Sequence, residues 1–150
     1  MKKIMLFSIL VFSFFTLLAC EKTTITYGMD YDQFDYILDY DEIFSQENDI
    51  YFVYIYSPTC INCISIKSTV LEFANTYEEY HIYFLNVDNA TSSLQTEYLD
   101  KVGKTKVVTP VFLIIKNQDI DETNVSNYYF SGATQIPAIL IDIQNGTYQF

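Results

Sequence analysis

The segment Ile50–Tyr56 is a continuous run of β-branched and aromatic residues, and it leads directly into the longest helical pattern in the chain. Such a run predicts a strand that is covered on both faces. Ser57, Pro58 and Thr59 end the strand. No Pro or Gly occurs in residues 60–80, and apolar residues recur there at helical spacing, at Ile66, Val70, Phe73, Ala74 and Tyr77. The chain therefore predicts a buried strand that runs through a short turn into a helix.

The rest of the chain alternates strand and helix patterns. We expect strands at residues 34–38, 81–87, 111–115 and 128–131. We expect helices at residues 39–47, 92–102 and 133–144, with Pro137 tolerated near the first turn of the last one. The resulting order, β-α-β-α-β-α-β-β-α, predicts an α/β domain whose last two strands form a hairpin.

Cys60 and Cys63 stand where the expected helix begins. Helical residues three apart are neighbours, with about 5–6 Å between Cβ atoms, which allows a disulfide after modest adjustment. Cys63 continues the apolar stripe of the helix and is expected to point inward. Cys60 lies at the turn, where the partial positive charge of the helix N-terminus favours a thiolate. The pair predicts dithiol–disulfide exchange in which Cys60 attacks and Cys63 resolves.

A cysteine pair at this spacing has two other common uses in proteins. A purely structural disulfide that closes a four-residue loop would stabilise the fold by only about 2 kcal/mol. A structural disulfide between distant segments would stabilise it more. A closed zinc site needs four ligands, whereas beyond Cys20 the chain offers two cysteines and His81, which we expect at a strand edge. We therefore expect neither a metal nor another cofactor.

Three segments resemble the thioredoxin-like family. Residues 51–63 are similar to the strand that leads into the family's active-site helix, residues 85–88 to its next strand, and residues 107–113 to the loop and strand that carry its cis-proline. The resemblance implies a central mixed β-sheet flanked by helices and a thiol–disulfide oxidoreductase activity. It also implies a cis Pro110 beside the cysteine pair, and a Thr109 backbone that binds an extended client as an added strand. An ordinary trans proline at a strand start is the alternative for Pro110.

Two positions depart from the family pattern. Tyr54, six residues before Cys60, stands where thioredoxins carry a buried acid. Ile61 and Asn62, between the cysteines, match neither the Gly-Pro of thioredoxins nor the Pro-His common in exported oxidants. The direction of electron transfer is therefore open between a reductant, an oxidant or isomerase, and an accessory protein for export of a peptide such as a bacteriocin. A non-catalytic binding or accessory module is the alternative from a different class.

The N-terminus has the pattern of an export signal. Lys2 and Lys3 precede an apolar stretch over residues 4–18, which ends at Ala19 and Cys20. Residues 17–20 resemble the bacterial lipobox, which implies attachment of lipid to the Cys20 sulfur and cleavage before that residue. A plain cleaved signal peptide and an uncleaved anchor are the alternatives. We expect a signal peptide over residues 1–19, a tether over 20–28 and a thioredoxin-like domain over 29–150.

This signal predicts a location on the outer face of the bacterial cytoplasmic membrane, with the domain held by its lipid. Disulfides persist outside the cytosol, so clients are expected among exported proteins or peptides with thiols or disulfides, and a membrane redox partner would reset the pair. The formal net charge of −11 argues against nucleic acid as a partner, because phosphate binding needs clustered Lys and Arg.

Overall fold

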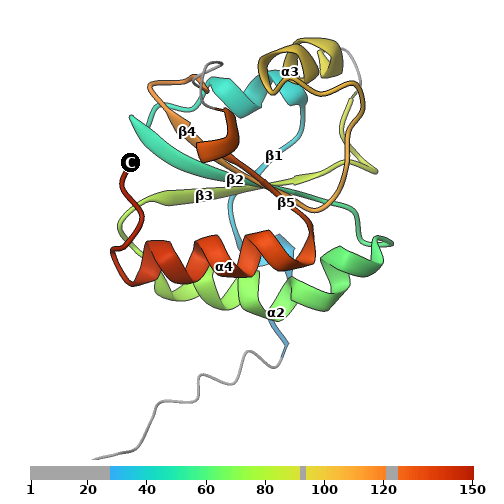
Figure 1. Ribbon diagram of the computed structural model, residues 1–150. Helices are drawn as coiled ribbons and strands as arrows, with labels where there is room; N and C mark the ends of the chain where they lie inside the picture. Colours follow the sequence, from blue (N-terminus) through green and yellow to red (C-terminus); the bar gives the residue numbers. More distant parts are fainter. Residues whose placement is uncertain (1–27, 92–93, 121–124) are drawn as a thin grey trace, which may run out of the picture.

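A computed structural model describes residues 28–91, 94–120 and 125–150 of the protein (Figure 1). Its strands are β1 (Tyr36–Ile37), β2 (Ile50–Tyr56), β3 (His81–Asn86), β4 (Val111–Lys116) and β5 (Tyr129–Ser131). Its α-helices are α2 (Ile61–Thr76), α3 (Gln95–Lys101) and α4 (Gly132–Gln144), and its 3₁₀ helices are η1 (Tyr31–Gln33), η2 (Tyr40–Phe44) and η3 (Val125–Asn127). The expected order of strands and helices is confirmed, and β2 has the expected bounds.

The five strands form one mixed sheet in the order β1-β3-β2-β4-β5. β3 pairs in parallel with both β1 and β2, whereas β4 is antiparallel to both β2 and β5. The expected hairpin is therefore present, with Val111 opposite Ser131. The expected α/β fold with a central mixed sheet is confirmed.

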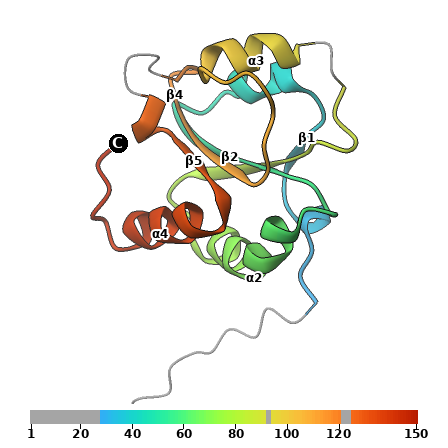
Figure 2. The same ribbon diagram turned by 45° about the vertical axis from the view of Figure 1, so that its right-hand side comes forward.

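Helices cover both faces of the sheet, with α2 and α4 on one side and α3 with η2 on the other (Figures 1 and 2). β2 supplies side chains to both layers because successive residues of a strand point to opposite faces. Phe52, Tyr54 and Tyr56 pack in the core under α2 and α4. Tyr51, Val53 and Ile55 pack in the core towards η2 and α3. The central strand is thus buried on both faces, as its continuous apolar run predicts.

Several expected boundaries are corrected. The helix expected at 39–47 is the shorter 3₁₀ helix η2, which begins after Asp39, whose carboxylate accepts a hydrogen bond from the N–H of Tyr40 at 2.9 Å. The strand expected at 34–38 narrows to β1, because only its two residues pair with β3. The helix expected over 60–80 is α2, which ends at Thr76 because the backbone of Tyr77 is extended. α3 is shorter than residues 92–102, of which 92–93 lie outside the described residues.

α4 begins at Gly132, directly after β5. Gly132 has a φ of 83°, a left-handed conformation that glycine adopts without steric penalty. Pro137 lies in the second turn of α4, just beyond the first turn, where its ring nitrogen cannot donate the usual helical hydrogen bond. The helix continues through it because Ile136, Ile139 and Leu140 are buried against the sheet.

Among the described residues, no helix combines the length and the apolar character that a membrane span requires.

Candidate functional site

The turn between β2 and α2 is held by the buried Ser57. Its hydroxyl donates to the carboxylate of Asp88 at 2.9 Å, and its Oγ accepts from the N–H of Thr59 at 3.3 Å. The N–H of Cys60 donates to the Ser57 carbonyl at 3.2 Å. These bonds fix a tight turn at the end of a central strand. Cys60 therefore lies at the position that caps the N-terminus of α2.

The two cysteines lie together with unequal exposure. The N–H of Cys63 donates to Sγ of Cys60 at 3.2 Å, so the Cys60 sulfur sits at the helix N-terminus, as expected from the sequence. Both residues are free thiols. Cys63 is 2% exposed and lies on the buried stripe with Ile66 and Val70, whereas Cys60 is partly exposed. One sulfur is therefore reachable and the other is sheltered behind it.

The loop before β4 reaches the Cys60 sulfur from a distant part of the sequence. The Sγ of Cys60 donates to the carbonyl oxygen of Thr109 at 3.4 Å. The Thr109–Pro110 peptide bond is cis, as the resemblance implies, and Pro110 is buried at the entry to β4. The structure thus brings together Cys60, Cys63 and the Thr109–Pro110 peptide. A client-binding role for Thr109 and Pro110 is still a prediction.

The surroundings shift the two thiol pKa values in opposite directions. Burial alone would raise the pKa of Cys60, but hydrogen bonds with the side chains of Cys63 and Thr109 and with the backbone N–H groups of Cys63 and Asn62 outweigh it, so that pKa is lowered. Burial, with the hydrogen bond to Cys60 next in size, raises the pKa of Cys63 to about 11. The more exposed sulfur is thus the better thiolate, which is the property of an attacking cysteine.

The Thioredoxin family model matches residues 37–136, a range that holds the whole of this site. The chain belongs to the thioredoxin family. Members of this family are thiol–disulfide oxidoreductases, and the Cys60–Cys63 spacing fits the family's C-x-x-C motif. The family assignment expected from the sequence is confirmed.

Solved thioredoxins have the same fold. The thioredoxin of Plasmodium falciparum is 18% identical, with a TM-score of 0.52 over 73% of this chain and 97% of that protein. The oxidised mitochondrial thioredoxin 3 of Saccharomyces cerevisiae is 14% identical, with a TM-score of 0.54 over 77% and 97%. The thioredoxin of Malassezia sympodialis is 18% identical, with a TM-score of 0.50 over 73% and 89%. No curated protein matches the chain at a significant level.

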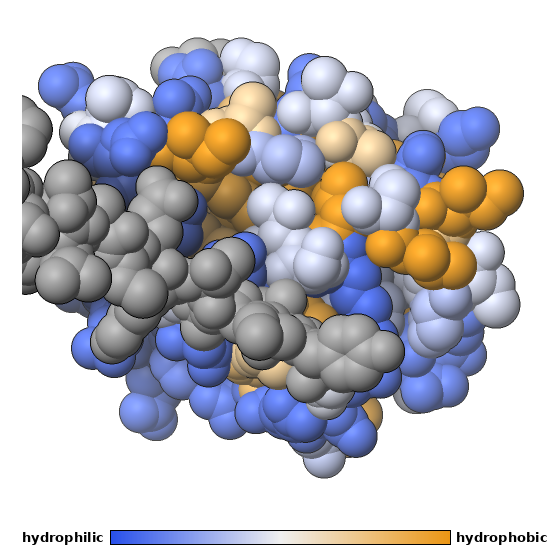
Figure 3. Space-filling view, turned by 90° about the horizontal axis from the view of Figure 1, so that it is seen from below, coloured by the Kyte–Doolittle hydropathy of each residue, from blue (hydrophilic) through white to orange (hydrophobic). Residues whose placement is uncertain are grey.

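Apolar side chains surround the thioredoxin-type site at the surface. Ile61 and Ile64 of α2 are 83% and 59% exposed, and Val108, next to Thr109, is 37% exposed. The face formed by α2 and α4 carries separate hydrophobic patches among hydrophilic residues (Figure 3). This apolar rim was not predicted from the sequence. The sequence pattern that could have predicted it is the position of Ile61 and Ile64, which lie off the apolar helical stripe that continues from Cys63.

The other residues singled out from the sequence lie away from the two sulfurs or outside the described part. His81 begins β3, and its Nε2 is 2.6 Å from the carboxylate of Asp35 at the surface, which confirms a strand-edge position. Within residues 28–91, 94–120 and 125–150, no three His, Cys, Asp or Glu side chains lie close enough to hold a metal ion. Cys20 falls outside the described residues.

Proposed function

We propose that this protein is an extracytoplasmic thiol–disulfide oxidoreductase that exchanges disulfides with exported proteins or peptides through Cys60 and Cys63. The observation that carries the proposal is the position of the Cys60 sulfur. It accepts the Cys63 N–H at the helix N-terminus and contacts the Thr109 carbonyl, with the Cys63 thiol buried behind it. This geometry supplies an accessible attacking sulfur and a sheltered resolving one.

In the reducing direction, the Cys60 thiolate attacks one sulfur of a client disulfide. A Cys60–client S–S bond forms, the client S–S bond breaks, and the second client sulfur leaves as a thiolate that takes a proton from water. Cys63 then loses its proton and attacks Cys60 Sγ, which closes the Cys60–Cys63 disulfide and releases the client with two electrons more. A membrane redox partner restores the dithiol. The oxidising direction is the same sequence reversed, and the potential of the pair against glutathione decides between them.

The client segment is proposed to lie along Thr109. A strand that approaches Cys60 passes the Thr109 backbone, which lies 3.4 Å from the attacking sulfur, so a client in extended form would place its disulfide at Cys60. The exposed Ile61, Ile64 and Val108 would contact apolar client side chains on either side. The site therefore suits unfolded or flexible chains better than charged small molecules.

An insulin reduction assay on the full chain in mild detergent, with a small dithiol as electron donor, tests this activity. We expect the wild type to accelerate insulin reduction and Cys60→Ser to return the rate to that of the dithiol alone, because a serine hydroxyl cannot form the mixed disulfide. Cys63→Ala serves as the second variant. The same background rate for all three proteins would contradict the proposal and favour a non-catalytic binding module.

The proposed location rests on the N-terminal sequence pattern, with residues 1–19 as the export signal and Cys20 as the lipid-bearing residue. We expect cells grown with a labelled fatty acid to incorporate the label into the wild-type chain and into Cys60→Ser, but not into Cys20→Ser. The measurement is label per chain after immunoprecipitation. Equal labelling of wild type and Cys20→Ser, or no label in either, would show that Cys20 carries no lipid.

A further inference from the structure

Two tyrosine hydroxyls in the core under α2 have no partner beyond each other among the described residues. Tyr54 of β2 is 0% exposed and Tyr31 of η1 is 8% exposed, and neither hydroxyl is bonded to a group outside this pair in the described part of the chain. Tyr51, also in β2, shows the usual arrangement, because its hydroxyl donates to the Ile43 carbonyl at 2.8 Å. Buried polar groups are normally paired, so two unpaired hydroxyls in one cluster call for a functional explanation.

Both rings belong to the same core cluster as Cys63. The Tyr31 ring lies 5.9 Å from the Tyr54 ring and 3.9 Å from the Tyr56 ring, measured between centroids. Burial raises the pKa of Tyr31 and of Tyr54, and a charge on Cys63 raises both pKa values further. The two tyrosines without a hydrogen-bond partner outside their own pair therefore share one core layer with the buried Cys63 thiol.

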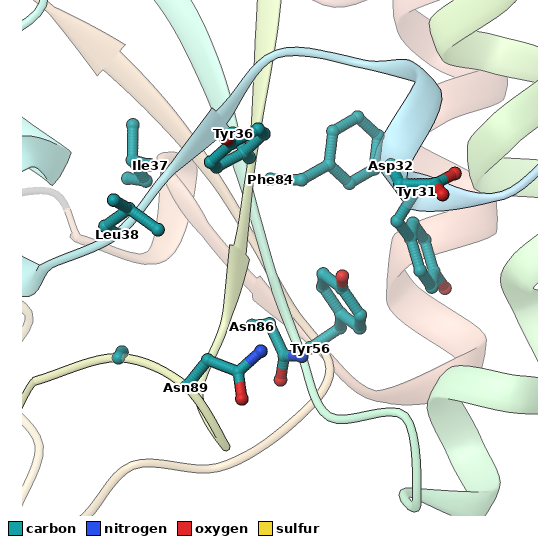
Figure 4. A pocket seen from close by; sticks show the side chains of 10 residues that line it. Tyr31, Asp32, Tyr36, Ile37, Leu38, Tyr56, Phe84, Asn86 and Asn89 are labelled. Atoms are coloured by element: carbon teal, nitrogen blue, oxygen red, sulfur yellow. The ribbon is translucent and has the colours of Figure 1, made fainter.

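A pocket of about 330 Å³ connects Cys63 to the surface on this side. It is lined by Asp30, Tyr31, Tyr56, Ser57, Pro58, Cys63, Ile64 and Lys67. At its rim, Lys67 Nζ lies 2.8 Å from Asp30 Oδ1, and both side chains are partly exposed. A water molecule occupies about 30 Å³ of liquid, so water can enter here. Tyr31 and Tyr56 also line a second pocket, beside β1, and so stand between the two (Figure 4).

We propose that the hydroxyls of Tyr31 and Tyr54 donate hydrogen bonds to the Cys63 sulfur as it becomes a thiolate, and that its proton leaves through the pocket towards Asp30. This inference rests on the proposed function, since it concerns the step in which Cys63 resolves the mixed disulfide. The two tyrosines thus act on the resolving sulfur, whereas the Cys60 sulfur depends on the helix N-terminus and Thr109.

The step balances with both tyrosines neutral. The Cys63 S–H bond breaks and its proton passes to pocket water. The sulfur's electron pair then forms the Cys60–Cys63 bond as the client thiolate departs. Burial raises the pKa of Tyr31 and of Tyr54, which keeps both phenols as O–H donors. The titratable groups around Cys63 are Cys60, Tyr31, Tyr54, Tyr56, Asp30 and Lys67. Of these, Tyr31 and Tyr54 are the buried donors with no other partner among the described residues.

The test uses Tyr31→Phe and Tyr54→Phe, each in a full chain with Cys20→Ser so that Cys60 and Cys63 are its two cysteines. Tyr98→Phe is the matched control, because Tyr98 is also buried but lies in the core on the other face of the sheet. The probe is dithiobis(nitrobenzoate), an aromatic disulfide that releases one coloured thiolate when Cys60 attacks it and a second when Cys63 resolves. Stopped-flow absorbance measures both phases as a function of pH.

We expect the second phase of Tyr54→Phe and Tyr31→Phe to be about tenfold slower at neutral pH, with a midpoint about one pH unit higher. Loss of a donor destabilises the thiolate, so its fraction falls at every pH below the midpoint, and the rates converge with wild type above it. The first phase should stay within about twofold of wild type. Loss of an unpaired hydroxyl should not lower stability, so thermal unfolding excludes a folding defect as the cause.

Wild-type second-phase profiles in both tyrosine variants, or equal slowing in Tyr98→Phe, would overturn the inference. Failure of the proposed function gives a different result, because the wild type would then not accelerate insulin reduction, whatever the second-phase profiles show. The insulin assay and the second-phase profiles therefore test the two proposals separately.

Discussion

The Cys63→Ala variant is expected to accumulate as a mixed disulfide with its client, while the wild type passes through that species too briefly for it to be collected. In the wild type the Cys63 sulfur lies one helical turn from Cys60, so its attack is intramolecular. Without it, only thiols in solution at millimolar concentration release the client. We expect the lifetime of the mixed disulfide to rise by at least about 1000-fold.

Non-reducing gels and mass spectrometry of the full chain after incubation with a disulfide-bearing protein measure the trapped species. Cys60→Ser is the matched control, because it keeps Cys63 but removes the exposed sulfur. The control should form no adduct, since Cys63 is 2% exposed and its pKa is raised to about 11. An adduct in Cys60→Ser but not in Cys63→Ala would mean that the roles of the two cysteines are reversed.

The parts of the fold that could be predicted are those whose signals are local in sequence. β2 was predicted with its observed bounds because every residue of Ile50–Tyr56 is apolar or aromatic and the strand is buried on both faces. The inward direction of Cys63 followed from helical periodicity, because Ile66, Val70 and Phe73 continue the same stripe. For elements with weaker sequence patterns, the predicted bounds differ from the observed ones. The segment at 39–47 carries acids suited to a helix start but forms only a 3₁₀ helix, capped by Asp39.

The candidate site depends on contacts that no local pattern specifies. Cys60 and Thr109 are 49 residues apart in sequence, and their contact was expected only through the family resemblance. Tyr54 was noticed as a departure from the family, but its neighbour Tyr31 was missed. Tyr31 belongs to η1, a short 3₁₀ helix with no periodicity, and it shares a core cluster and a pocket with Cys63 because η1 lies beside Tyr56 at the end of β2. Such pairings become visible only in three dimensions.

The second large effect is expected at Phe52, in the middle of β2. Its ring is 5.2 Å from that of Phe112, 6.0 Å from that of Phe73 and 5.9 Å from that of Phe150, measured between centroids, and it is 0% exposed. Phe52→Ala removes the ring that joins β4, α2 and the C-terminus, and it leaves a cavity among them. We expect the free energy of unfolding to fall by about 3–5 kcal/mol, measured by urea denaturation.

Ile141→Ala on α4 is the control for Phe52→Ala, because Ile141 is apolar but 53% exposed, and its effect should stay within about 0.5 kcal/mol. A loss below about 1 kcal/mol for Phe52→Ala would show that the aromatic cluster is not what holds α2 to the sheet. Cys63 shares this cluster with Phe52. Any looseness in the packing of α2 would therefore also expose the resolving sulfur, and its alkylation at neutral pH should rise in Phe52→Ala but not in Ile141→Ala.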